Sequence, residues 1–321
     1  MRLTKPIIVA LVAGAVAAFV FALIGPGAVW ISCLAGGGLT TLAVWGLFHV
    51  WRWAGGRRSL AWILILAFVL RLGVGIALHL LLPIYGDDEP VQNAGYVFYD
   101  AWQRDQQSWQ LAQSDQALFS AFGSEFYSDQ YGGLLWLGSL IYRFLSPDAQ
   151  RPMLMVILGA FTAAVGAAFL IRAVQSRFDP SIALVAGWIY ALYPESILQG
   201  ASQMREPFLM GLSAIAWWAV IAIPRTPIRW HPLAALIAAS LGLMVLSWRA
   251  ALPISGASNK AAITAMQSAP AAMTSAALRR VMPPMATIGT VNSVRACRIR
   301  SRLARLASGL VPEAKTAPNA T

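Results

Sequence analysis

The chain has 321 residues, of which 58% are hydrophobic and only 12% are charged. A soluble domain carries about twice that share of charged residues, so we predict an all-α polytopic membrane protein. The net charge of +11 does not indicate a nucleic-acid-binding protein, because residues 255–321 hold nine Lys and Arg against one acid, Glu313. The two cysteines, Cys33 and Cys297, are too few for a disulfide framework or a cysteine metal site.

Seven apolar runs approach the roughly 20 residues that a helix needs to cross a bilayer. The first run is interpreted as a helix rather than a signal peptide, because it is long and is followed by a poor cleavage site, GPG. A further run, 131–145, is too short for a comfortable span and suits an interfacial or re-entrant helix. The predicted spans are 6–24, 28–50, 59–83, 153–174, 181–198, 207–223 and 233–248.

The distribution of basic residues favours an arrangement in which 131–145 does not cross. Arg172, Arg177, Arg225 and Arg229 then fall on the same side as the basic N-terminus, as the positive-inside rule requires. The segment 84–152 and the turn at 199–206 are consequently expected to share the extracytoplasmic side. Nine of the 13 acids of the chain lie within 84–150, so we expect the acidic chemistry on that one surface.

Three regions follow from these patterns. Residues 1–58 form an N-terminal helical hairpin, and 59–252 form a membrane domain with a long first extracytoplasmic loop, 84–152. All 34 aromatic residues precede Leu252, and the segment 253–321 is basic and has no clear period. We expect this segment to be either a disordered basic tail on the membrane surface or a frameshifted end that replaces further spans. Resequencing the coding region distinguishes the two.

The stretch FYDAWQRDQQSWQLA, 98–112, places a carboxylate inside an aromatic stripe. Four residues share a narrow stripe on a helical wheel: Phe98, Trp102, Trp109 and Ala112. Asp105 falls in the middle of it. Poor hydration there would raise the pKa of the Asp105 carboxyl and suit it to act as a general base. The alternatives are that the stretch is a loop, or that Asp105 caps a helix beginning at Gln106.

A second group of acids, GDDE at Gly86–Glu89, follows the third predicted span. Asp88 and Glu89, with the acid before them, could bind a divalent cation. They could equally form a solvated loop that ends the helix. The sequence leaves both interpretations open.

Three arginines are candidates for binding a phosphate group. Arg71 lies within a predicted span, where a charge needs a partner such as an acid of the outer loop or a lipid phosphate. Arg151 opens the 153–174 span and could bind a phosphate or anchor the helix at the interface. Arg205 has the planar fork of donors that phosphate recognition uses. Glu206, followed by Pro207, also reads as an ordinary helix start.

The order of these motifs resembles the GT-C membrane glycosyltransferases, which include protein O-mannosyltransferases and lipid A aminoarabinose transferases (glycosyltransferase family 39-like). Asp105–Ala112, D-x-x-x-W-x-L-A, is similar to the D-E-x-x-Y-x-x-A motif of the family's first outer loop. The downstream DQYGG, the arginine that opens the next span, and the turn QMREPF follow in the family's order. The resemblance covers about 59–248. It departs from the family at Gln106, where many members have Glu, and at DQYGG, where they have HPPL.

The resemblance implies sugar transfer from a polyprenyl-phosphate donor to an extracytoplasmic acceptor, at the outer face of the bacterial inner membrane. It implies that Asp105 is the base, with Asp88 and Glu89 as rivals. It implies that Arg151 stabilises the leaving phosphate, with Arg205 or Arg71. Asp129 and Glu206 are further site candidates. The sequence does not identify a cofactor and leaves open whether a divalent cation is needed. Membrane lipid is an expected partner.

Three other functions remain open at this stage. The chain could be a transporter or flippase for a lipid-linked sugar, although no duplicated halves are visible. It could be a membrane scaffold subunit. It could also be an inactive remnant of a transferase, which the aberrant tail would explain.

Overall fold

The computed structural model describes residues 4–123, 126, 129, 131–223 and 230–247. These residues contain helices and no strand, which confirms the all-α class. The predicted tail, 253–321, lies outside them. The elements in chain order are α1 (Thr4–Ile24), α2 (Val29–Ser32), the π-helical turn η1 (Cys33–Gly37), α3 (Gly38–Trp53), α4 (Arg58–Tyr85), α5 (Pro90–Asn93), α6 (Tyr99–Gln113), the 3₁₀ turn η2 (Leu118–Phe122), α7 (Gly133–Leu145), α8 (Met153–Gln175), α9 (Pro180–Leu192), α10 (Pro194–Gly200), α11 (Glu206–Ala222) and α12 (Trp230–Leu246).

Four described helices are long and apolar enough to cross a membrane, and they match the first four predicted spans within a few residues. The pair α9 and α10, bent by 53°, makes a fifth if it counts as one span. The helices α11 and α12 have 17 residues each, or ~26 Å, which is less than the ~30 Å hydrocarbon core. The structure therefore supports a membrane protein with four or five spans by this measure, fewer than the seven predicted.

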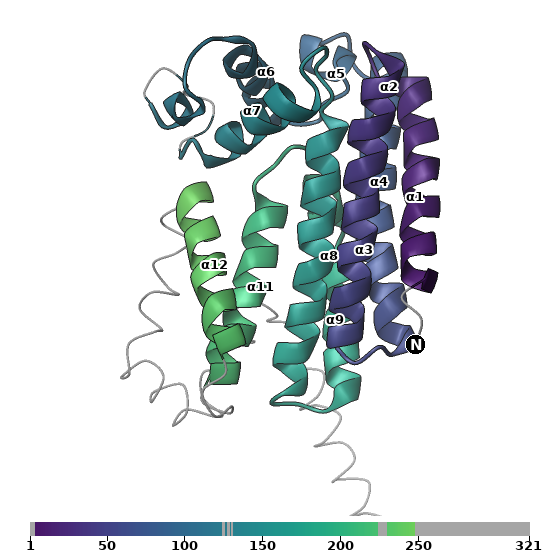
Figure 1. Ribbon diagram of the computed structural model, residues 1–321, viewed down its shortest axis with the longest axis vertical. Helices are drawn as coiled ribbons and strands as arrows, with labels where there is room; N and C mark the ends of the chain where they lie inside the picture. The colour runs from purple at the N-terminus through teal and green to yellow at the C-terminus, as the bar shows by residue number, and fades with distance from the viewer. Residues whose placement is uncertain (1–3, 124–125, 127–128, 130, 224–229, 248–321) are drawn as a thin grey trace, which may run out of the picture. The chain divides into compact units, whose positions relative to one another are not determined.

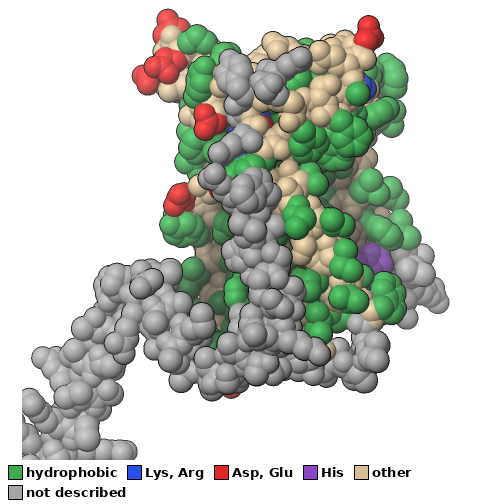
Figure 2. All heavy atoms as spheres, turned by 90° about the vertical axis from the view of Figure 1, so that its left-hand side faces the viewer, with side chains coloured by type: hydrophobic (Ala, Val, Ile, Leu, Met, Phe, Trp, Pro, Cys, Tyr) green, Lys and Arg blue, Asp and Glu red, His purple; other side chains and the backbone are tan. Residues whose placement is uncertain are grey.

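The long helices run side by side, and α6, η2 and α7 lie across one end of the bundle (Figure 1). We call α5, α6, η2 and α7 the roof. The run 131–145, predicted not to cross, forms α7 within this roof. Figure 2 shows hydrophobic side chains over much of the visible flank, with Asp and Glu mostly toward the roof end. Most of the visible acidic side chains therefore lie at the roof end of an otherwise apolar flank.

The helix α8 is the centre of the bundle. In its most apolar stretch 72% of the residues are buried, against 17% in α1. Small residues let α11 approach α8 closely: a Cβ added at Gly166 would lie 2.6 Å from the Cα of Gly211, and one added at Gly211 would lie 2.4 Å from the carbonyl oxygen of Thr162. Such small-residue contacts are the usual way for helices to pack tightly in a membrane.

Arg71 of α4 is fully buried at the break between α9 and α10. Pro194 has no N–H, so the carbonyl of Tyr190 lacks its helical donor. The Arg71 guanidinium donates to the carbonyls of Tyr190 and Ala191 at 3.4 Å each, and to Ser196 Oγ at 2.7 Å. Within the described residues no acid pairs with Arg71, and its Nε is buried without a partner. The arginine instead satisfies the end of α9, where the helix dipole favours a cation.

The N-terminal hairpin packs α1 against η1 and α3. A Cβ at Gly36 would lie 2.4 Å from the Phe21 ring, and one at Gly37 would lie 2.8 Å from the Ala18 Cβ. The glycines thus allow η1 to approach α1 closely. The other faces of α1 remain largely exposed, as expected for a helix at the edge of a membrane bundle.

Candidate functional site

Asp105 lies in the middle of α6 and is fully buried in the roof. The alternatives of a loop or a cap at Gln106 are therefore wrong, because α6 begins at Tyr99. Three neutral groups donate hydrogen bonds to the carboxylate. The Tyr96 hydroxyl donates to Oδ2 at 2.6 Å, the Tyr142 hydroxyl of α7 donates to Oδ1, and the Gln150 amide donates to Oδ2.

Burial and hydrogen bonding act on the Asp105 carboxyl in opposite directions. Burial raises its pKa above the ordinary 3.8, and the donated hydrogen bonds of Tyr142, Tyr96 and Gln150 reduce that rise. Burial also raises the pKa of both tyrosine hydroxyls well above 10, with the negative Asp105 adding to the effect. The tyrosines therefore stay protonated and act as donors at neutral pH. The result is a carboxylate whose proton affinity exceeds that of a solvated aspartate, as a general base requires.

A second polar group lies beside Asp105, and we call it the arginine cluster: Arg104, Asp129, Gln203, Arg205 and Glu206. Arg104 is the neighbour of Asp105 in α6 and is buried, and its Nη1 donates to the Gln203 carbonyl at 3.0 Å. This bond joins the roof to the turn that follows α10. The segments 84–152 and 199–206, expected on one side, thus meet at the same end of the bundle.

The charges of the arginine cluster interact with one another. Burial lowers the pKa of the Arg104 guanidinium, the acids Asp129, Asp100 and Glu206 raise it, and Arg205 lowers it. Arg205 also lies over the Tyr131 ring, with its Cζ 5.1 Å from the centroid. The cluster therefore combines two cations with two carboxylates within electrostatic reach.

Several buried atoms of the arginine cluster have no hydrogen-bond partner within the described part of the chain. The unpaired donors are Arg104 Nε, Arg205 Nη1 and Gln203 Nε2, and the unpaired acceptors are Gln203 Oε1, Asp129 Oδ1 and Glu206 Oε2. Buried polar groups are nearly always paired, and leaving one unpaired costs ~1–3 kcal/mol. So many unpaired atoms in one place indicate a site that water or a polar ligand fills.

Asp129 also has a structural role. Its Oδ2 accepts the N–H groups of Leu134 and Leu135 at 2.8 and 3.1 Å, at the start of α7. This is the stabilising placement for an acid near a helix N-terminus. Only its Oδ1 remains for another partner. Glu206 is the first residue of α11, as the Glu206–Pro207 pair predicts.

Arg151, the predicted phosphate ligand, has no donor to spare. Its side chain is buried, and the guanidinium forms a two-point ion pair with Asp148, at 2.6 and 3.0 Å. The remaining hydrogen bonds go to Ser32 Oγ, Ser146 Oγ, and the carbonyls of Pro26 and Ala28. The hydrogen bond from Arg151 holds the pKa of Asp148 well below its usual range. Arg151 thus ties the α1–α2 turn to the loop before α8.

No family model, curated protein or solved structure matches the chain.

The acids after α4 do not join this site. Asp87, Asp88 and Glu89 are exposed, and the Asp88 carboxylate accepts a hydrogen bond from Asn93 at 3.1 Å. Within the described residues, no three His, Cys, Asp or Glu side chains converge as a metal site would need. The three acids lie exposed just after the end of α4.

Five site residues were not singled out from the sequence: Tyr96, Arg104, Tyr142, Gln150 and Gln203. Arg104 had a usable signal, because Ala101, Arg104 and Ser108 lie at helical spacing with Asp105 on the same face. The other four come from separate elements, and only the folding of the roof over the bundle brings them to Asp105.

Proposed function

We propose that this protein transfers a sugar from a polyprenyl-phosphate donor to an extracytoplasmic acceptor. One observation carries the proposal: a buried carboxylate, held only by neutral donors, lies beside two arginines with unpaired N–H groups, at one end of an apolar helical bundle. A base next to an anion site is what such a transfer needs. An apolar bundle of membrane-spanning length suits a donor with a lipid tail.

The reaction is a single displacement with inversion. Asp105 takes the proton of an acceptor hydroxyl or amine while the acceptor atom forms a bond to the anomeric carbon. The bond from that carbon to the phosphate oxygen breaks, and polyprenyl phosphate leaves with the electron pair. Arg205 and Arg104 stabilise the leaving phosphate, because their free N–H groups are buried and the low dielectric strengthens their attraction.

The acceptor must displace one donor from Asp105. Tyr96 and Tyr142 are buried, whereas Gln150 is only half-buried and belongs to the loop before α8. We expect the acceptor to enter from the Gln150 side and to replace its hydrogen bond. Arg151 and Arg71 keep their structural contacts in this scheme. The proposal includes the bacterial inner membrane, a roof facing outside, and α11 and α12 as sixth and seventh spans.

The test is sugar transfer in membranes that contain the full chain and radiolabelled polyprenyl-phosphate sugars. Asp105→Asn should abolish transfer and retain donor binding, because the amide cannot take the proton. Arg205→Gln should reduce both transfer and donor binding. Asp115→Asn is the matched control, since Asp115 is an exposed acid just after α6.

The outcomes separate the candidate functions. Transfer that survives in Asp105→Asn would move the base to Asp88 or Glu89. Donor binding without transfer by the wild-type chain would favour a transporter of the lipid-linked sugar. A folded chain that neither binds nor transfers would favour a scaffold or an inactive remnant.

A further inference from the structure

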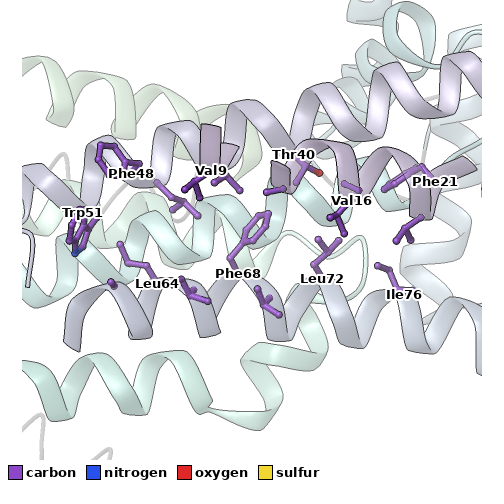
Figure 3. A pocket seen from close by; sticks show the side chains of 18 residues that line it. Val9, Val16, Phe21, Thr40, Phe48, Trp51, Leu64, Phe68, Leu72 and Ile76 are labelled. Atoms are coloured by element: carbon purple, nitrogen blue, oxygen red, sulfur yellow. The ribbon is translucent and has the colours of Figure 1, made fainter. Parts of the chain in front are cut away.

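A long apolar groove lies between α1, α3 and α4, away from the roof site. Its volume is about 590 Å³, and every one of its lining side chains is apolar apart from Thr40. Figure 3 shows Phe48 and Trp51 at one end, Phe68 near the middle, and Phe21 and Ile76 at the other end. The groove forms because α1 packs closely on α3, whereas α4 makes few contacts with these two helices.

The length of the groove suits one hydrocarbon chain. The lining residues of α4 run from Ala61 to Ile76, which is ~22 Å along a helix. One leaflet of the hydrocarbon core is about 15 Å thick. A chain that enters at the Trp51 end can therefore lie lengthwise in the groove over the whole depth of its leaflet.

The Trp51 end of the groove is positively charged. Arg52, Arg57 and Arg58 all lie in or beside the α3–α4 loop, and all three are exposed. The Arg52 guanidinium lies over the Phe48 ring, 5.9 Å from its centroid, and Phe48 lines the groove. The Trp51 indole donates to the Arg57 carbonyl at 2.9 Å, which fixes the loop against the groove.

Nothing in this part of the chain neutralises these arginines. Residues 1–86 contain no Asp or Glu at all. The apolar groove matches the acyl chain of an anionic lipid, and the three exposed arginines at its end match the negatively charged headgroup. Basic pockets between membrane helices bind such headgroups. A neutral lipid would fill the groove but would not neutralise the three arginines.

We propose that the groove of α1, α3 and α4 binds one anionic phospholipid, with an acyl chain against Phe68 and its phosphate at Arg52, Arg57 and Arg58. The excess of arginine at this end assigns it to the cytoplasmic leaflet by the positive-inside rule, where anionic lipids attract such residues. The site is independent of the sugar transfer proposed above, since it shares no residue with the roof.

The test is native mass spectrometry of the purified full chain, titrated with phosphatidylglycerol and phosphatidylcholine of identical acyl chains. The wild-type protein should retain one phosphatidylglycerol in preference to phosphatidylcholine. Replacing Arg52, Arg57 and Arg58 by Gln should reduce that preference by about fivefold for each arginine removed. Arg177→Gln, which removes an exposed arginine from the α8–α9 turn, should leave it unchanged.

A second variant tests the groove itself. Ala17→Phe fills the groove, because Ala17 lines it, and should reduce the binding of both lipids. Val12→Phe is the control, since Val12 is an exposed residue of α1 outside the groove. Equal binding of the two lipids by the wild type, an unchanged preference in the triple variant, or full binding by a folded Ala17→Phe would each overturn the proposal. Retention of polyprenyl phosphate in place of the phospholipid would also overturn it.

Discussion

The geometry of Arg151 makes a prediction that separates a structural arginine from a ligand-binding one. Arg151→Lys keeps the charge and removes the planar fork. An ammonium has three N–H donors against five in the guanidinium. At least two of the contacts with Ser32, Ser146, Asp148 and the α1–α2 turn must therefore be lost.

The expected cost follows from those contacts. A hydrogen bond to a charged group contributes ~1.5–3 kcal/mol, so two lost bonds would cost ~3–6 kcal/mol. The Asp148 side chain keeps 23% of its surface exposed, and water can rehydrate its carboxylate. We therefore expect the lower end, ~3 kcal/mol, which is also the lower end for breaking a buried ion pair. In a domain of this size that corresponds to a fall in Tm of about 6–12 °C.

The assay is thermal unfolding followed by tryptophan fluorescence, at fixed detergent concentration. Arg177→Lys is the control, because Arg177 is exposed. If Arg151→Lys unfolds at the same temperature as this control, the structural argument for Arg151 is wrong. If it is equally stable but loses binding of the polyprenyl-phosphate donor, Arg151 returns to the phosphate-binding role that the sequence predicted.

Tyr142→Phe removes a donor to Asp105 and should lower the free energy of unfolding by ~1.5–3 kcal/mol, with exposed Tyr85→Phe as an unaffected control. Burial raises the pKa of folded Asp105 above 3.8. Between pH 3.8 and that raised pKa, the folded protein holds a proton on Asp105 that the unfolded chain has released. Stability should therefore fall as pH rises above 3.8, and less steeply in Asp105→Asn; transfer activity should rise through the same window. Gly211→Ala should cost ~1–3 kcal/mol by collision with Thr162, while Gly73→Ala, with open space around it, should not destabilise.

The sequence alone predicted what depends on local composition. Runs of apolar residues near 20 long predicted the spans of α1, α3, α4 and α8, since a membrane helix satisfies its own backbone and needs only length and hydrophobicity. The short run 131–145 was predicted as a non-crossing helix for the same reason. The helical spacing around Asp105 predicted that this one carboxylate would be drawn away from water, and it is fully buried.

The partners of the charged side chains were decided only by the tertiary structure. Arg71, Arg151 and Arg205 look alike in the sequence, yet every donor of Arg151 is used, Arg71 binds carbonyls and a hydroxyl but keeps its Nε unpaired, and Arg205 keeps Nη1 unpaired. A cation in a poorly hydrated place needs a partner, but the sequence does not say which distant segment supplies it. Here the partners lie up to 125 residues away, because α4 meets α10, and the loop before α8 meets the α1–α2 turn, only when the helices pack.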